Sequence, residues 1–136
     1  MTVEEAVYYR LSNDTTVKRW VANRIYPLVA PQDAAFPFLV YQESGHSRLR
    51  SISGSTAVRE FRLRIDGYAT RYQVAKALRD SILARLGNYN GTIGNVVIMD
   101  INQEDTSDEH LPPVNADEKG IFGAGIDLTI YYTGGD

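Results

Sequence analysis

The sequence has 136 residues, of which 43% are hydrophobic and 23% charged, with a net charge of −3; this is typical of one folded domain. It contains no cysteine, which excludes a disulfide framework, a thiolate metal site and a cysteine nucleophile. No segment approaches the roughly 20 apolar residues of a membrane helix, and residues 1–5 lack the pattern of a signal peptide, so we expect a soluble protein made in the cytoplasm.

Two short helices are predicted at the N-terminus. Thr2 and Glu5 have the spacing of a capping box, and the apolar residues that follow recur at helical intervals up to about Ser12. Asp14 is a candidate N-cap for a second helix, whose apolar face consists of Val17, Trp20 and Val21. Prolines at 27, 31 and 37 exclude regular helix from the next segment, which we expect to be extended or turning.

Two strands are predicted over residues 38–43 and 58–68. In the second, apolar and charged residues alternate with the period of a sheet that buries one face, with Phe61, Leu63 and Ile65 against Glu60, Arg62, Arg64 and Asp66. The intervening residues 44–56 are rich in serine and glycine and include Arg48 and Arg50. We therefore expect a long, mobile hairpin loop there.

The longest predicted helix covers residues 71–86. Apolar residues recur every four positions, Thr70 is a candidate N-cap, and Gly87 is expected to end the helix in the left-handed conformation. Strands are then predicted at 93–101 and 122–132, separated by a mobile, acidic loop at 102–119. Glycines between 120 and 125 lead into a strand, so a bulge or a close backbone approach explains them better than a phosphate-binding loop does.

The predicted order of elements is α-α-β-β-α-β-β. This order is typical of an α+β fold, and we expect a single domain over residues 1–136. Its antiparallel sheet should have about four strands, with the helices packed on one face.

Charge is distributed unevenly along the chain. Residues 100–120 hold seven acids and one base, whereas residues 44–72 hold six arginines and few acids. Two differently charged surfaces would suit contacts between unlike patches, although both could also be plain solvated faces. The candidate interface residues are Arg48, Arg50, Arg62, Arg64, Glu104, Asp105, Asp108 and Glu109.

No catalytic, cofactor-binding or metal-binding constellation is evident. His46 and His110 are the only histidines, and neither has a second ligand at metal-binding spacing. The acids between 104 and 109 lack the glycine-anchored register of a calcium loop. Nine tyrosines against four phenylalanines favour a binding or assembly module over an enzyme.

Several segments, taken together, resemble the bacteriophage tail completion proteins, a tail-to-head joining family. These are Arg24-Ile25-Tyr26-Pro27, Ala30-Pro31-Gln32, Phe36 to Gln42, Ile65 to Ala69 before the long helix, and the final strand ending in tyrosines. The resemblance implies a small α+β subunit that forms a ring, typically a hexamer, at the head-proximal end of the tail tube. Such a ring would stop tube polymerisation and contact both tail tube protein and head connector.

The resemblance also implies a location in the virion, after assembly in the cytoplasm of the bacterial host. DNA would pass through the ring without specific binding, and no membrane partner is expected.

Two other classes of protein stay open. A nucleic-acid-contacting protein would use the arginines, against which the sequence pI of about 5.3 argues. A small enzyme would need a pocket with convergent ionisable groups.

Overall fold

The computed structural model describes the backbone of residues 1–51, 54–112 and 120–136, and the side chains of these residues except 47–51 and 54–56. Three helices and six strands follow one another within these described residues. They are α1 (Val3–Ser12), α2 (Thr15–Val21), β1 (Ile25–Pro27), β2 (Phe38–Ser51), β3 (Gly54–Ala69), α3 (Tyr72–Leu86), β4 (Gly91–Ile93), β5 (Val96–Leu111) and β6 (Ile121–Gly134). The predicted α+β domain is confirmed. No helix within the described ranges is long and apolar enough to cross a membrane.

Both predicted N-terminal caps are confirmed. The Thr2 hydroxyl accepts a hydrogen bond from the Glu5 N–H at 3.1 Å, and the Glu5 carboxylate accepts one from the Thr2 N–H at 3.2 Å. The Asp14 carboxylate accepts the Val17 N–H at 3.0 Å and begins α2 in the same way. These bonds satisfy backbone donors that have no partner inside a helix.

Helix α3 lies where it was predicted, but both of its predicted caps are wrong. Arg71, not Thr70, is the N-cap residue, and its side chain makes no capping hydrogen bond. Gly87 is extended, with φ −60° and ψ 131°, and Asn88 has the positive φ instead. A Cβ at Gly87 would lie 2.8 Å from the Leu83 carbonyl oxygen, so close packing of the chain requires this glycine.

The sheet differs from the predicted antiparallel sheet of about four strands. It has six strands in the order β1-β2-β3-β6-β5-β4, and β1 runs parallel to β2. The prediction missed β1 and β4 because strands of three residues are too short to show alternation. The four long strands are antiparallel to their neighbours and form the centre of the sheet.

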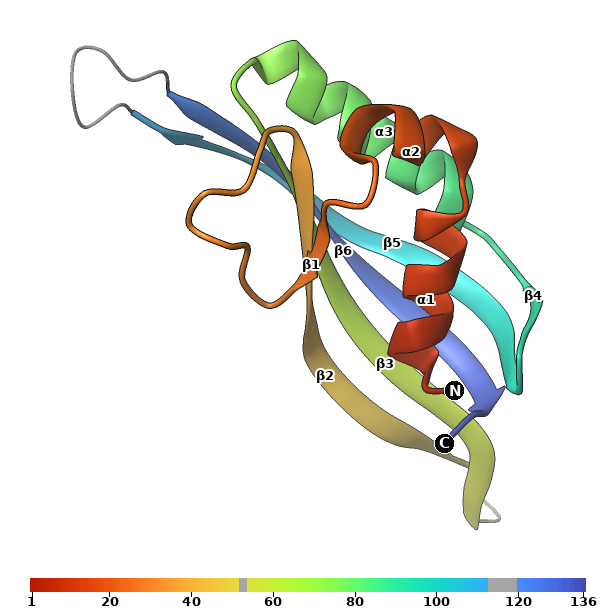
Figure 1. Ribbon diagram of the computed structural model, residues 1–136. Coiled ribbons are helices and arrows are strands. Elements are labelled where there is room, and N and C mark those ends of the chain that lie inside the picture. The colour runs from red at the N-terminus through yellow and green to blue at the C-terminus, as the bar shows by residue number, and fades with distance from the viewer. Residues whose placement is uncertain (52–53, 113–119) are drawn as a thin grey trace.

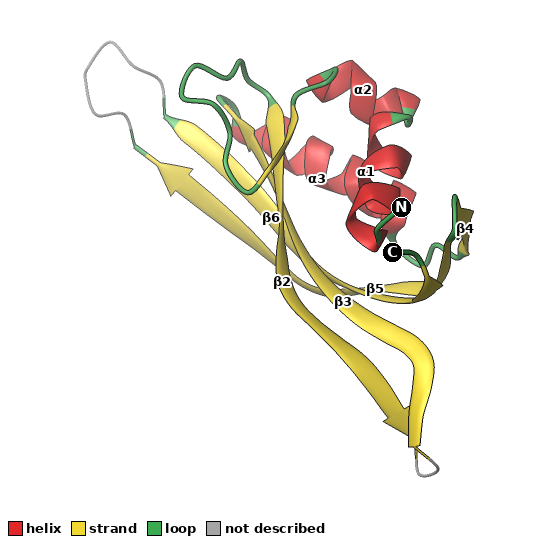
Figure 2. Cartoon of the chain, turned by 60° about the horizontal axis from the view of Figure 1, so that its bottom comes forward, coloured by secondary structure: helices red, strands yellow, loops and turns green. Residues whose placement is uncertain are grey.

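The hydrophobic core lies between the helices and one face of the sheet. Figures 1 and 2 show all three helices on the same side of a curled sheet, which leaves the opposite face without a helix. The alternation predicted for β3 is confirmed, because Phe61, Leu63 and Ile65 are buried. They meet side chains of β6 and of α3, including Ile126, Leu128, Ile130, Leu78 and Ile82.

In place of the two predicted long loops, the structure has two β-hairpins that extend from the sheet. They are formed by β2 with β3 and by β5 with β6, and are here called the β2–β3 arm and the β5–β6 arm. The chain is in β2 up to Ser51 and in β3 from Gly54, so 52–53 are the only residues of the predicted loop 44–56 outside the described strands. Likewise, β5 continues to Leu111 and β6 begins at Ile121, and residues 113–119 lie outside the described residues. Figure 1 shows that the two arms leave the helical layer at opposite ends of the sheet. Their mobility stays a prediction.

Replacing Leu63 with alanine tests the burial of the inner face of β3. Leu63 is fully buried, so Leu63→Ala should lower the free energy of unfolding by about 2–5 kcal/mol. Met99→Ala is the matched control, because Met99 is 50% exposed and its loss should change stability by about 0.5 kcal/mol or less. Urea unfolding followed by circular dichroism measures both. Equal losses would contradict the assigned orientation of β3.

Candidate assembly surfaces

The sheet face opposite the helices, here called the outer face, carries the charged residues of β3. Arg62 is 62% exposed on this face, and its Nε donates to the Glu60 carboxylate at 3.0 Å. A solvated ion pair of this kind contributes little to stability. Arg62 also lines a shallow hollow of about 580 Å³ with Glu104, Asp127 and Tyr131. Arg62 comes from the basic segment 44–72 and Glu104 from the acidic segment 100–120, so the two segments meet in this hollow.

Arg64 is held much more firmly than Arg62. Its guanidinium donates to Asp66 and to Asp127 at 3.0 Å each and to the Ser107 hydroxyl, and only 22% of the side chain is exposed. Partial burial by itself lowers the pKa of Arg64, but the bonds and charges of Asp66 and Asp127 outweigh it and raise that pKa. The network joins three strands, because these partners lie on β3, β6 and β5.

A glycine makes room for this network. A Cβ at Gly125 would collide with the Arg64 guanidinium and with the Asp66 carboxylate. The predicted close backbone approach in the segment 120–125 is therefore confirmed at this position. The side chains of Arg64 and Asp66 lie over the bare backbone of β6, where only glycine fits.

The four candidate acids all lie on β5 rather than in a loop. Glu104, Asp105 and Glu109 are exposed, and the Asp105 carboxylate accepts the N–H of Thr106 at 2.9 Å. Asp108 is set apart from them, because its partners belong to α3 on the helix side of the sheet. The acids therefore do not form one continuous patch.

Asp108 anchors the β5–β6 arm to α3. Its carboxylate accepts hydrogen bonds from the Tyr72 hydroxyl at 3.0 Å, from Lys76 at 3.2 Å and from Arg79 at 3.0 Å. The Tyr72 bond, followed by the Lys76 bond, holds the pKa of Asp108 below its ordinary value. Sequence reasoning missed this cluster, although Tyr72, Lys76 and Arg79 at helical spacing mark one face of the helix.

The remaining candidate residues are Arg48 and Arg50. Their backbone belongs to β2, where they pair with Arg59 and Ser55 of β3. Their side chains lie outside the described residues. Their role in an interface stays a prediction.

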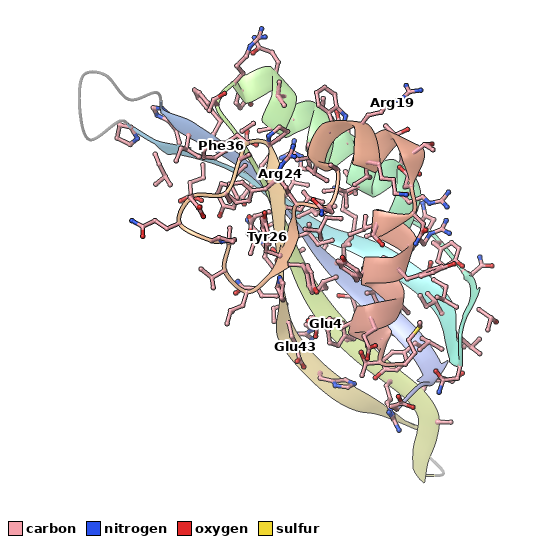
Figure 3. The ribbon with its side chains drawn as sticks, in the orientation of Figure 1. Glu4, Arg19, Arg24, Tyr26, Phe36 and Glu43 are labelled. Atoms are coloured by element: carbon pink, nitrogen blue, oxygen red, sulfur yellow. The ribbon has the colours of Figure 1, made fainter. Side chains whose placement is uncertain are left out.

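An apolar patch at one end of the outer face was not predicted. Phe38 packs on Phe36, Tyr26 and Tyr68 with ring centroids 5.1–6.0 Å apart. Figure 3 shows Phe36 and Tyr26 beside the start of β2, with Arg24 close by. An apolar hollow of about 270 Å³ adjoins these rings, and the exposed side chains of Leu28, Val29 and Leu111 contribute to it. The only sequence signal was the abundance of tyrosine.

The two histidines serve in ring contacts. His46 Nε2 lies 2.7 Å from the Tyr132 hydroxyl, and His110 stacks on Phe122 with centroids 4.7 Å apart. Among the side chains that the structure describes, no group of three His, Cys, Asp or Glu residues could hold a metal ion. The features that we take as candidates for function are the charged outer face, the apolar patch and the two hairpin arms.

Replacing Arg64 tests whether it is structural. Arg64→Ala leaves Asp66 and Asp127 without their shared cation, so stability should fall by about 1–3 kcal/mol. Arg62→Ala on the same strand should cost about 0.5 kcal/mol or less, because its ion pair is solvated. Thermal and urea unfolding of both variants give the comparison. A larger loss for Arg62→Ala would refute the assigned roles.

The charge on Asp108 predicts a dependence on pH. Because the folded protein lowers the pKa of this carboxyl, its contribution to stability is complete above the ordinary value of 3.8 and is lost as pH falls through the lowered value. Asp108→Asn removes that contribution. The difference in unfolding free energy between the native chain and Asp108→Asn should therefore shrink below about pH 4. A difference that stays constant down to pH 2 would show that the carboxylate charge is not responsible.

Comparison with known proteins agrees with the resemblance seen in the sequence. The sequence model of the family described as Tail completion protein gp17 matches residues 5–113. Among solved structures, a chain of "Virion of native gene transfer agent (GTA) particle" superposes with a TM-score of 0.71 at 16% sequence identity. The match covers 98% of this chain and 96% of that chain, so the whole fold is shared. No curated protein sequence matches this one.

The family match extends from α1 through β5, well over half of the chain. It includes the capping residue Glu5, the proline-bounded entry into β2 and the charged outer face of β3. The predicted family is thus confirmed: the chain belongs to the tail completion protein gp17 family.

Proposed function

We propose that this protein forms a ring, a hexamer, at the head-proximal end of a phage tail tube. The ring ends polymerisation of the tube and joins the tail to the head connector. The observation that carries the proposal is the family match over residues 5–113, which makes this chain a structural tail protein. The likeness to a chain from a gene transfer agent particle supports a place in a virion.

The geometry supports a ring subunit because it provides distinct contact regions. A subunit in a ring meets its two neighbours through two different surfaces. Here the β2–β3 arm and the β5–β6 arm point away from the body at opposite ends of the sheet (Figure 2). The acids Glu104, Asp105 and Glu109 lie on one arm, and the arginines Arg48 and Arg50 belong to the other.

Contact with nucleic acid through its phosphates is the weaker alternative. The arginines of β3 would be the natural phosphate ligands, but Arg62 pairs with Glu60, and Arg64 pairs with both Asp66 and Asp127. Because these arginines already have carboxylate partners, we expect them to neutralise fewer phosphates than unpaired arginines would. We propose that DNA passes through the ring without tight binding.

Tail reconstitution tests the proposed function. The purified chain is added to polymerising tail tube protein of the same phage, and tubes are examined by electron microscopy. We expect a ring at one end of each tube, tubes that stop growing as the chain is added, and attachment to heads only when the ring is present. Tubes of unchanged length that carry no bound chain would refute the proposal.

Bovine serum albumin at the same concentration controls for crowding. Met99→Ala is a folded-variant control, since Met99 is 50% exposed and is not one of the candidate interface residues. The Leu63→Ala protein should terminate tubes less well only in proportion to the fraction of its molecules that are unfolded. The comparison separates a loss of assembly from a loss of fold.

A further inference from the structure

The long strands β2 and β5 lie next to the short edge strands β1 and β4, which cover only part of their length. Strand β1 pairs with β2 only at residues 39–41, and β4 pairs with β5 only at residues 96–98. The Asn88 N–H also donates to the Ile101 carbonyl at 2.9 Å, which covers that position. Beyond these contacts, no other strand among the described residues lies beside residues 42–51 of β2 or residues 102–111 of β5 on the side away from the sheet centre.

A long open edge can be extended by a further strand. Such an edge offers a row of backbone N–H and C=O groups, and monomers keep edges short, cover them, or protect them with charges and bulges. Both edges here carry register shifts, at 43/45 and 48/50 in β2 and at 103/105 in β5. Here the three-residue strands β1 and β4 cover only the parts of the edges near the helical layer. The parts that form the arms stay open, one on each side of the same sheet (Figure 2).

The direction of the strands allows one copy to continue the sheet of another. The four long strands lie in the order β2-β3-β6-β5 and alternate in direction, so β2 and β5 run in opposite directions. A second copy that extends the sheet in the same orientation therefore places its β5 antiparallel to β2. Repeating this step joins copies head to tail, the geometry that closes rings.

The charges on the two edges favour this pairing over its symmetric alternatives. Residues 102–111 contain neither lysine nor arginine, and their acids Glu104, Asp105 and Glu109 are exposed and lie outside the cluster that Asp108 forms with α3. Two β5 edges would therefore repel each other. Residues 42–51 contain Arg48 and Arg50 with a single acid, Glu43. Opposite charges across neighbouring strands stabilise a sheet, so the β5 edge is better matched to the β2 edge than to itself.

We propose that neighbouring copies of this chain pair the β2 edge of one with the β5 edge of the next, so that one antiparallel sheet runs from subunit to subunit. This rests on the ring proposed above and assigns its subunit interface. When residues 45–48, which lie between the two register shifts of β2, align antiparallel with residues 105–108, which follow the last register shift of β5, position 48, an arginine, lies opposite Asp105. The next position, Ser44, then lies opposite Glu109. The bond from the Thr106 N–H to the Asp105 carboxylate satisfies an edge donor in the free chain.

Engineered cysteines test the interface directly, since the native chain has none. Ser44→Cys is combined in turn with cysteine at Ser107, Glu109 or Leu111, which follow one another along the same face of β5. The variants are assembled on tail tubes, oxidised and separated on non-reducing gels. We expect a ladder from dimer up to the full ring, strongest with Glu109→Cys.

Single-cysteine variants and a misplaced pair are the controls. Ser44→Cys alone and Glu109→Cys alone should stay monomeric on the gel, because head-to-tail pairing does not bring identical positions together. Ser44→Cys with Asp80→Cys should also stay monomeric, since Asp80 is exposed on α3 and away from both edges. Dimers of either single variant would instead show two-fold pairing of identical edges and overturn the proposal.

The outcomes separate this interface from the proposed function. Rings seen on tubes by electron microscopy without any of the three cross-links would overturn the edge pairing and leave the function intact. Cross-linked ladders from a chain that neither binds nor terminates tubes would support the edge pairing and overturn the function. Each result is read from the same samples.

Discussion

The antiparallel pairing of β3 with β6 determines both faces of this molecule. Residues 59–69 lie opposite 122–132 without a break in register, so side chains far apart in the sequence are paired across the centre of the sheet. On one face this pairing builds a continuous apolar surface for α1 and α3. On the other face it brings Arg64 between Asp66 and Asp127. A slip by one residue would exchange the two faces, so the core and the charge network depend on the same register.

The sequence predicts elements well where one face is buried. The alternation of β3 around Leu63, the caps at Thr2 and Asp14, and the extent of α3 all reflect burial or backbone hydrogen bonds within a few residues. The arms could not be predicted in this way. Residues 102–111 are mostly exposed, so the strand shows no apolar period. The pattern of hydrophobic side chains does not reveal the backbone pairing of β5 with β6.

The role of the charged candidate residues in an interface stays a prediction, and their arrangement in the fold was not predicted. The register of β5 against β6 shifts between Gln103 and Asp105, and a bulge of this kind moves every later side chain to the opposite face. Asp108 therefore points to Lys76 and Arg79 on α3, whereas Ser107 reaches Arg64 on the outer face. The position of such a bulge depends on the pairing of the whole sheet, so it cannot be predicted from the local sequence. The same limit applies to the aromatic patch, which joins rings from the β1 region, β2 and β3.

The bond between Asp108 and α3 gives the β5–β6 arm a mechanical property. Strand β6 continues from this arm into the centre of the sheet, where it is bonded to β3, and β3 continues into the other arm. The two arms are therefore joined through one hydrogen-bonded sheet, and the β5–β6 arm is also bonded to α3 through Lys76 and Arg79. We expect a twist imposed on one arm to be carried through the sheet to the other. A partner that bends one end of this subunit would then change the angle presented at the opposite end.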